Sequence, residues 1–118
     1  MTHAVPAFDD LKRGHVVLSP DPFTRDDDST RPWVVVNNQN HPFHSEQHLV
    51  MGLTTRTWYD ERIPLTTDDY RHRTAPRKSS IVPHAVASIN PTLITDYVCQ
   101  IRAEPLDRAV STLLEYLS

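Results

Sequence analysis

The stretch Pro32-Trp33-Val34-Val35-Val36-Asn37-Asn38 carries the strongest strand signal in this chain of 118 residues. β-Branched and aromatic side chains favour extended backbone, and proline and asparagine bound the run on its two sides. The apolar residues are consecutive instead of alternating with polar ones, which is the pattern of a strand buried on both faces. The segment therefore predicts a strand inside a small β-barrel.

Other short apolar runs lie on both sides of this segment. They predict strands at 15–19, 48–55, 62–65 and 94–101, and a strand region over 80–89 that is interrupted at Pro83. Gly52 suggests a bulge or a tight barrel bend, and Pro64 places its short strand at a sheet edge. Residues 66–79 are charged and poor in apolar side chains, so we expect a long surface loop with room for one helical turn.

The C-terminal segment has a helical period. Its apolar residues recur three or four positions apart, and Pro105 suits the first turn of a helix. We expect an amphipathic helix over 104–117, packed on the sheet. The sequence thus predicts a mainly β (α+β) fold: a small barrel of five to six short strands with a C-terminal helix. A single domain is expected over 1–118, with a loose lead-in at 1–11.

Composition excludes several classes of protein. Ten prolines against two glycines rule out a coiled coil or helical bundle, and neither a P-loop nor a G-x-G-x-x-G motif can be written. Cys99 is alone, which excludes a disulfide framework and a Cys-rich zinc site; it is expected to be a small buried hydrophobe. No leader or long apolar stretch is visible, so we expect a cytoplasmic protein without a membrane span.

Charge is unevenly distributed along a chain whose net charge is -3. Asp26 to Asp28 form an acidic run, whereas Arg71, Arg73, Arg77 and Lys78 lie close together in the second half. A local basic patch binds phosphate even on an acidic chain, because association responds to the local field.

The elements and their order resemble the MazF/PemK toxins of type II toxin–antitoxin systems. Arg31 to Asn38 is similar to the arginine-proline strand of these toxins, and Val50 to Thr55 to their strand that ends in Ile-Thr. The likeness spans roughly residues 11–117 and includes Arg13-Gly14-His15-Val16-Val17, Ile63-Pro64-Leu65, Ser80-Ile81-Val82 and the C-terminal helix.

The resemblance implies an SH3-like barrel that acts as the toxin of such a pair. It implies a metal-independent endoribonuclease, without cofactor, that cleaves single-stranded RNA or mRNA by attack of a 2′-hydroxyl. It also implies a homodimer, a cognate antitoxin that occupies the RNA groove, and DNA binding together with that antitoxin. By position, Arg31 and Thr54 match the catalytic arginine and threonine of the family.

Two segments depart from the family's pattern. His84-Ala85-Val86-Ala87 stands where members commonly have (E/D)-Q-I-R, and the acidic 26–28 run replaces a glycine-rich turn ahead of Arg31. A second hypothesis follows from these departures, in which a non-catalytic SH3-like barrel binds RNA or a protein partner. A third is a histidine-dependent metal protein.

Metal-free RNA cleavage needs a base, an acid and a cation near the phosphorane. Arg31 suits the cation's role, because a guanidinium stays charged and grips two phosphate oxygens; the alternative is a surface arginine paired with the acidic run. Thr54 would position the scissile phosphate, and Thr55 would donate a hydrogen bond to RNA. The alternative is that both threonines serve only to favour the strand conformation.

Histidines are the candidates for proton transfer. His84 lies at the place of the family's acidic residue, and His44 lies in a loop that leads toward Thr54; His84 is equally explained as a polar residue at the barrel rim. The x2 and x3 spacing of His41, His44 and His48 is also that of metal ligands. Because Pro42 argues for an irregular loop, we expect a solvated loop there and no metal.

The remaining basic residues are candidates for binding the RNA backbone. This group comprises Arg56, Arg71, Arg73, Arg77 and Lys78, with Tyr70 and His72 able to stack on bases. The alternative is a flexible, solvated loop. Trp33, within the apolar run, is expected in the core or in a dimer interface.

Overall fold

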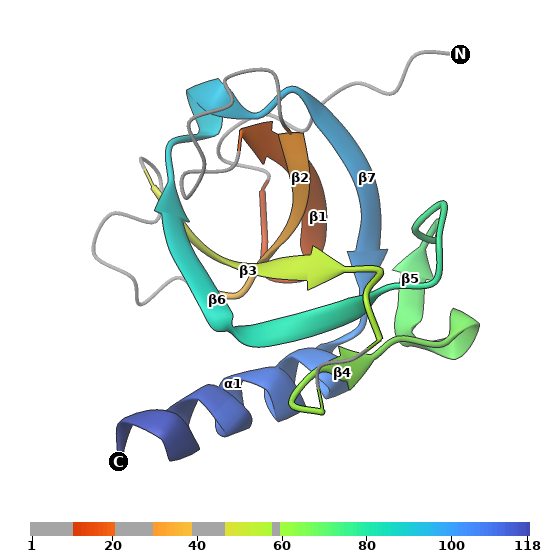
Figure 1. Ribbon diagram of the computed structural model, residues 1–118. Coiled ribbons are helices and arrows are strands. Elements are labelled where there is room, and N and C mark those ends of the chain that lie inside the picture. Colours follow the sequence, from red (N-terminus) through yellow and green to blue (C-terminus); the bar gives the residue numbers. More distant parts are fainter. Residues whose placement is uncertain (1–10, 21–29, 39–46, 58–59) are drawn as a thin grey trace.

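The computed structural model describes residues 11–20, 30–38, 47–57 and 60–118. Within them, seven strands form one antiparallel sheet that curls into a half-barrel, with a C-terminal helix α1 (Ala103–Leu117) lying across its lower end (Figure 1). The strands are β1 (His15–Pro20), β2 (Thr30–Val35), β3 (His48–Thr54), β4 (Ile63–Pro64), β5 (Tyr70–His72), β6 (Ser80–Ile89) and β7 (Asp96–Ile101).

The mainly β fold with a C-terminal helix is confirmed. The strand order is β4-β6-β3-β2-β1-β7-β5, so the two short strands β4 and β5 form the sheet edges. One 3-10 turn, Thr67–Asp69, joins them, and its capping box is made by the hydroxyl and backbone of Thr66 and the side chain of Asp69. The chain therefore passes from one sheet edge to the other in a few residues.

The sheet is buried on both of its faces. Successive residues of β2 enter different apolar clusters: Val34 packs with Val16 and Met51, whereas Trp33 and Val35 pack on the opposite face. All three β2 residues are almost fully buried. The prediction of a strand buried on both faces is confirmed, and Trp33, with 2% of its surface exposed, belongs to the core of this chain.

Helix α1 begins one residue before the predicted start and ends at the predicted Leu117. Its buried residues are Pro105, Leu106 and Ala109, and Leu106 and Ala109 join the core cluster that contains Val34 and Met51. The exposed ion pair between Arg13 and Asp107, 2.9 Å between nitrogen and oxygen, links the helix to the segment before β1.

Gly14, just before β1, is a position that requires glycine. Its φ is +101°, a conformation that residues with a side chain rarely adopt, and a Cβ there would lie 2.6 Å from the carbonyl oxygen of Ile101. This backbone approach is fixed by the hydrogen bond from the Ile101 N–H to the Gly14 carbonyl, 2.8 Å. Glycine therefore lets β7 lie close to the entry of β1.

Several predicted boundaries are wrong. Residues 66–79 contain the predicted helical turn but also the strand β5, which the sequence did not reveal because two of its three residues are charged or polar and exposed. Strand β2 starts at Thr30 and ends at Val35, not at Asn38. Beyond Val35 the Val36 N–H still donates to the Leu49 carbonyl at 2.9 Å, and the Asn37 side chain then completes the contact, since its Oδ1 accepts the Leu49 N–H at 3.0 Å.

The predicted lead-in lies mostly outside the described residues, which begin at residue 11. Leu11 itself is buried, 6% exposed, and packs with Val17 and Trp33, so this last residue of the lead-in belongs to the core. Among the described residues, no helix has the length and apolar character that a membrane span needs.

Candidate functional site

The pairing between strands β2 and β3 ends at the place where the candidate residues lie. Their pairing runs from Val35↔Val50 to Trp33↔Gly52 and then stops, although β2 continues back through Pro32 to Thr30 along β1. Proline has no N–H to donate, so the ladder cannot continue at Pro32. The gap between the strands is lined by Arg31 on one side and Thr54 on the other.

A bulge in β6 adds a third wall. The partner of Gly52 is Val82, whereas the partner of Met51 is Val86, so Pro83, His84 and Ala85 are extra residues on β6. The interruption predicted at Pro83 is thus a bulge inside a continuous strand, and the bend predicted at Gly52 is confirmed as its counterpart. His84 is exposed and lines the same hollow as Arg31.

Four predicted site residues meet at this place. Arg31, Thr54, Arg56 and His84 line one hollow of about 140 Å³, which we call the catalytic hollow because candidate catalytic residues line it. A second hollow of about 170 Å³, the bridging hollow, shares Arg31, Thr54 and Arg56 with it and adds Thr55 and Ser79. The four residues come from β2, β3 and its end, and the β6 bulge. His44, the other proton-transfer candidate, lies outside the described residues.

The Thr54 hydroxyl has a defined orientation. It is half-buried at the end of β3, and its Oγ1 accepts a hydrogen bond from the backbone N–H of Arg56 at 3.1 Å. A hydroxyl has one proton and two lone pairs, so this bond leaves the proton available to donate. The turn thus aims a donor into the catalytic hollow.

The described residues that line the catalytic hollow include positive charges and no negative one. Arg31 and Arg56 carry permanent charges, and neither this hollow nor the bridging hollow is lined by an aspartate or glutamate within the described part of the chain. Two guanidinium groups beside a hydroxyl donor and an imidazole can bind an anion such as phosphate and move a proton next to it.

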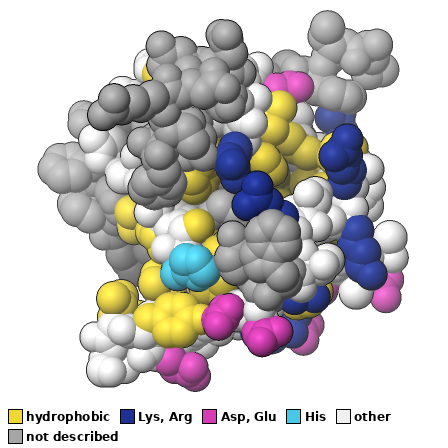
Figure 2. Space-filling view, in the orientation of Figure 1, with side chains coloured by type: hydrophobic (Ala, Val, Ile, Leu, Met, Phe, Trp, Pro, Cys, Tyr) yellow, Lys and Arg dark blue, Asp and Glu magenta, His cyan; other side chains and the backbone are white. Residues whose placement is uncertain are grey.

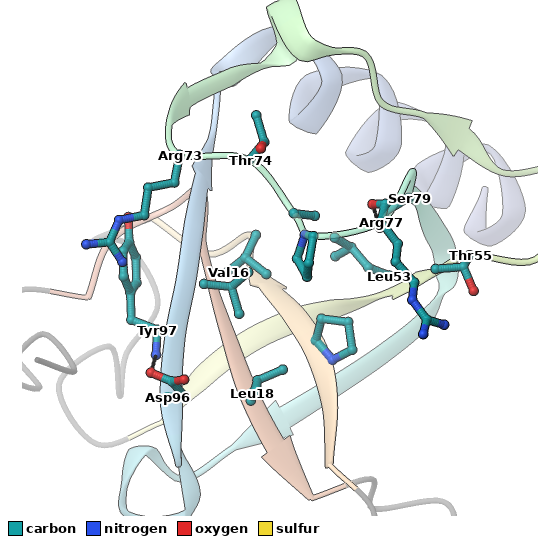
Figure 3. A pocket seen from close by; sticks show the side chains of 14 residues that line it. Val16, Leu18, Leu53, Thr55, Arg73, Thr74, Arg77, Ser79, Asp96 and Tyr97 are labelled. Atoms are coloured by element: carbon teal, nitrogen blue, oxygen red, sulfur yellow. Dashed lines mark hydrogen bonds between the residues drawn. The ribbon is translucent and has the colours of Figure 1, made fainter. Parts of the chain in front are cut away.

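The basic residues of β5 and of the loop that follows it divide into two groups. Arg73 and Arg77 line a larger apolar hollow of about 510 Å³, which shares Pro32, Leu53, Thr55 and Ser79 with the bridging hollow (Figure 3). Arg71 and Lys78 are exposed but line none of these three hollows. Figure 2 shows dark blue Lys and Arg side chains on both sides of a yellow apolar area, with acidic side chains at the lower part of the view and others at its top and right edge.

Neither aromatic stacking candidate stands free for a base. Tyr70 packs against the core, and burial is the main cause that raises the pKa of its hydroxyl. The His72 Nδ1 forms a 3.0 Å hydrogen bond with the Tyr97 hydroxyl, and the two rings are stacked. Tyr97 and Asp96 line the apolar hollow and were missed by the sequence analysis, which treated the segment that became β7 only as a structural strand.

The three spaced histidines are not brought together in the described residues. His48 begins β3 and is 2% exposed, whereas His41 and His44 lie outside the described residues. Across the described ranges, no group of three His, Cys, Asp or Glu side chains could hold a metal ion. Cys99 is buried as expected, and burial raises the pKa of its thiol to about 12.

Comparison with known protein families gives one match over residues 12–117, to the PemK-like, MazF-like toxins of type II toxin–antitoxin systems. The chain belongs to this family. The resemblance noted from the arginine-proline and threonine strands is thereby confirmed. A comparison with curated proteins gave no match.

Solved structures of MazF proteins share the fold of this toxin-family chain at low sequence identity. MazF from Deinococcus radiodurans superposes with a TM-score of 0.70 at 14% identity, covering 97% of each chain. A mycobacterial endoribonuclease in complex with its cognate antitoxin gives 0.65 at 16% identity over 88% of this chain and 92% of that one. The Mycobacterium tuberculosis toxin MazF-mt6 gives 0.61 at 12% identity over 88% and 94%.

Proposed function

We propose that the chain is the toxin of a type II toxin–antitoxin pair and a metal-independent endoribonuclease that cleaves single-stranded RNA. The observation that carries this proposal is the meeting of Arg31, Thr54, Arg56 and His84 in one hollow, from separate parts of the sequence. Family membership supplies the toxin class. The chemistry of the hollow supplies an anion site beside a proton-transfer group.

The reaction is attack of a ribose 2′-oxygen on the adjacent phosphorus. The O2′–P bond forms as the 2′-hydroxyl gives up its proton to a base, the P–O5′ bond breaks, and the 5′-oxygen takes up a proton, which leaves a 2′,3′-cyclic phosphate and a 5′-hydroxyl. Arg31 stabilises the added negative charge of the phosphorane, because its guanidinium binds two oxygens at once. Thr54 donates a hydrogen bond from its hydroxyl to a phosphate oxygen, since its Oγ1 already accepts one from the Arg56 N–H.

Arg56 and His84 complete the chemistry in place of the family's missing acidic-Gln-Ile-Arg sequence. Arg56 contributes the second positive charge from the turn after β3, on the same hollow as Arg31. His84 transfers the proton, because the two nitrogens of an imidazole can accept and donate a proton. The chain thus gives the second arginine's role to an arginine at another position, and the acidic residue's role to a histidine at the same place.

The partners follow from the family and the surface. Relatives of known structure are complexes of an endoribonuclease, or of MazF, with an antitoxin. We propose single-stranded RNA as substrate and a cognate antitoxin that covers the same positive surface. We also propose action in the cytoplasm as a homodimer, and DNA binding only together with the antitoxin. Arg71 and Lys78 would add to the attraction of the RNA backbone at longer range.

The test is RNA cleavage by the purified protein with EDTA present. Wild-type protein should give discrete products with 5′-hydroxyl ends, and Arg31→Ala should cleave at least about 10²-fold more slowly. Arg108→Ala removes an equally charged, exposed side chain on α1 and is the matched control. Cleavage by Arg31→Ala at the wild-type rate would refute the assignment.

The departure from the family's motif at 84–87 supports a second candidate function, a barrel that binds RNA or a protein without cleaving it. The same samples distinguish the two functions. A gel shift with intact RNA after long incubation, reduced in Arg31→Ala, would favour the binding protein.

A further inference from the structure

Tyr97 of β7 is the centre of a group of side chains that the proposed reaction does not use. Only 8% of its surface is exposed. The His72 Nδ1 lies 3.0 Å from its hydroxyl oxygen, and the two rings are stacked with 24° between their planes. The His15 ring meets the phenol ring edge-on from β1, with 5.5 Å between the ring centres. Contacts from β1 and β5 therefore fix the orientation of this ring on β7.

The guanidinium of Arg73 lies over the same ring. Its Cζ is 5.7 Å from the ring centre, which is within the range of a cation–π contact. Figure 3 shows the Arg73 side chain reaching toward the Tyr97 ring. The donors of a guanidinium lie in its own plane, so a contact with the ring face leaves its edge available to phosphate oxygens.

Within the described ranges, Arg73 forms no ion pair with a carboxylate. Asp96 lines the same apolar hollow, but its Oδ1 accepts a hydrogen bond from the Tyr97 N–H at 2.8 Å. The ring of Tyr97 is thus the contact that holds the Arg73 guanidinium, and the positive charge is not neutralised by a described acidic side chain.

The backbone at Arg73 is strained. Its φ is +57°, the left-handed region, which costs free energy for any residue that has a Cβ. Glycine or asparagine occupies such a position more easily. Strain of this kind is found at sites where the conformation serves binding, which points to a use for the arginine side chain.

Tyr97 and Arg73 line the apolar hollow but neither of the two hollows that Arg31 lines. The apolar hollow shares Pro32 and Leu53 with the bridging hollow, so the depressions are continuous. A single-stranded RNA with its scissile phosphate at Arg31 therefore has further phosphates along this surface. The Arg73 guanidinium is placed to bind one of them and not the scissile one.

We propose that Tyr97 is a positioning residue for RNA binding. Its ring, fixed by the two histidines, holds the Arg73 guanidinium where it binds a phosphate outside the scissile bond. The inference rests on the proposed function and adds a residue that acts through another. An arginine side chain that is already held loses less rotational freedom on binding than a free one, so binding is tighter. Tyr97 thereby raises the affinity for RNA and takes no part in the chemical step.

The test is a double-mutant cycle between Tyr97 and Arg73. Tyr97→Leu removes the ring, and Arg73→Gly removes the guanidinium and keeps the turn, because glycine adopts this φ without strain. Tyr116→Leu and Arg108→Ala, both at exposed positions on α1, are the matched controls. The ligand is an oligonucleotide of the preferred cleavage sequence, mapped on mixed RNA, with a 2′-deoxy nucleotide at the scissile position. Fluorescence anisotropy gives the Kd.

Arg73→Gly should raise the Kd about ten-fold and Tyr97→Leu about three- to ten-fold, whereas the two controls should leave it unchanged. The double variant should bind less than about two-fold more weakly than Arg73→Gly alone, because Tyr97 acts through the guanidinium. Single-turnover cleavage at saturating protein should stay within about two-fold of the wild-type rate in Tyr97→Leu. Additive losses of affinity, or a loss confined to the cleavage rate, would overturn the proposal.

His72→Ala keeps the proposal testable where Tyr97→Leu does not fold. The His72 side chain is exposed, so its removal breaks the hydrogen bond to the Tyr97 hydroxyl without opening the core. This variant should raise the Kd at least about two-fold in the wild-type background and leave it unchanged in the Arg73→Gly background. An equal loss in both backgrounds would overturn the proposal, since His72 would then act without Arg73.

Two outcomes separate this role from the proposed function. If the wild-type protein binds and cleaves RNA and Arg73→Gly has the wild-type Kd, the role of Tyr97 is overturned and the nuclease stands. If the wild-type protein neither binds nor cleaves RNA, both proposals are overturned.

Discussion

The backbone N–H of Arg56 donates a hydrogen bond of 3.1 Å to Oγ1 of Thr54. This bond spans only two residues, so it forms as soon as the chain turns at the end of β3. It fixes the rotamer of a hydroxyl that lines both the catalytic hollow and the bridging hollow. The same turn brings the Arg56 side chain to these hollows. The position of the Thr54 hydroxyl and that of the second positive charge therefore depend on the same turn.

Thr54→Val removes this hydroxyl and keeps the shape of the side chain. We expect RNA cleavage to slow by about 10²-fold, the usual cost of losing one donor to a developing negative charge, with little change in unfolding free energy. Thr54→Ser keeps the hydroxyl and should retain most of the rate. Equal rates for the valine and serine variants would show that the Thr54 hydroxyl takes no part.

The role of His84 is tested by the leaving group. His84→Ala should slow cleavage of ordinary RNA by about 10²-fold or more. A substrate with sulfur in place of the 5′-oxygen has a leaving group that needs no proton. If His84 is the acid, His84→Ala should therefore cleave this substrate at nearly the wild-type rate. If His84 is the base, the variant should stay slow on it. Single-turnover rates on both substrates give the answer. Full activity of His84→Ala on ordinary RNA would contradict any proton-transfer role.

Gly14 and Gly52, the two glycines of the chain, should respond differently to alanine. At Gly14 the new Cβ would lie 2.6 Å from the Ile101 carbonyl oxygen at a φ of +101°, so we expect Gly14→Ala to lower the unfolding free energy by about 2–4 kcal/mol. At Gly52 the nearest atom would be the Ala85 Cβ at 3.4 Å, and the cost should stay below about 1.5 kcal/mol. Urea unfolding measures both; similar losses would contradict the argument.

Cys99 makes stability depend on alkaline pH. Burial raises the pKa of its thiol from 9.0 to about 12, so above pH 9 the unfolded chain loses this proton before the folded chain does. The contribution to stability is complete below pH 9 and is lost as the pH rises toward 12, at up to about 1.4 kcal/mol per pH unit. Cys99→Ala should be less stable near neutrality and fall less steeply with alkaline pH.

The matched measurement for Cys99 is urea unfolding of both proteins between about pH 8 and 10.5. Tyr70 and Tyr97 also have raised pKa values, first because of burial and second because of the charge of Cys99, so their part of the slope also decreases in Cys99→Ala. The difference between the two curves therefore measures Cys99 together with its effect on the two tyrosines. Parallel curves would contradict a buried, protonated thiol.

Strong local patterns made much of the fold predictable. The Trp33–Val35 run, the glycine opposite a bulge and the helical period of the last fifteen residues each have a local cause, and all three appear in the structure. Strand β5 was missed because Tyr70–His72 does not alternate apolar and polar residues. It is a strand because it pairs with β7. Strand β6 continues through Pro83 because this residue, which has no N–H to donate, lies in the bulge and has no partner residue on β3.

The residues proposed for the site could be chosen from the sequence, whereas their spatial arrangement could not. Arg31 and Thr54 stand out by their positions at strand ends, and His84 by its place after Pro83. What the sequence could not give is the parting of β2 from β3 and the register shift in β6, both of which depend on pairing between distant segments. The apolar hollow was missed for the same reason, since its lining comes from four strands and one loop.

The central claim is cleavage by a 2′-hydroxyl in a hollow that uses arginine, threonine and histidine. The most direct measurement compares two oligonucleotides of the preferred sequence in EDTA, one all-RNA and one with a single 2′-deoxy nucleotide at the scissile position. Our account predicts that the all-RNA oligonucleotide is cut to a 2′,3′-cyclic phosphate and a 5′-hydroxyl and that the 2′-deoxy oligonucleotide stays intact. Cleavage of the 2′-deoxy oligonucleotide, or products with a 5′-phosphate, would contradict it.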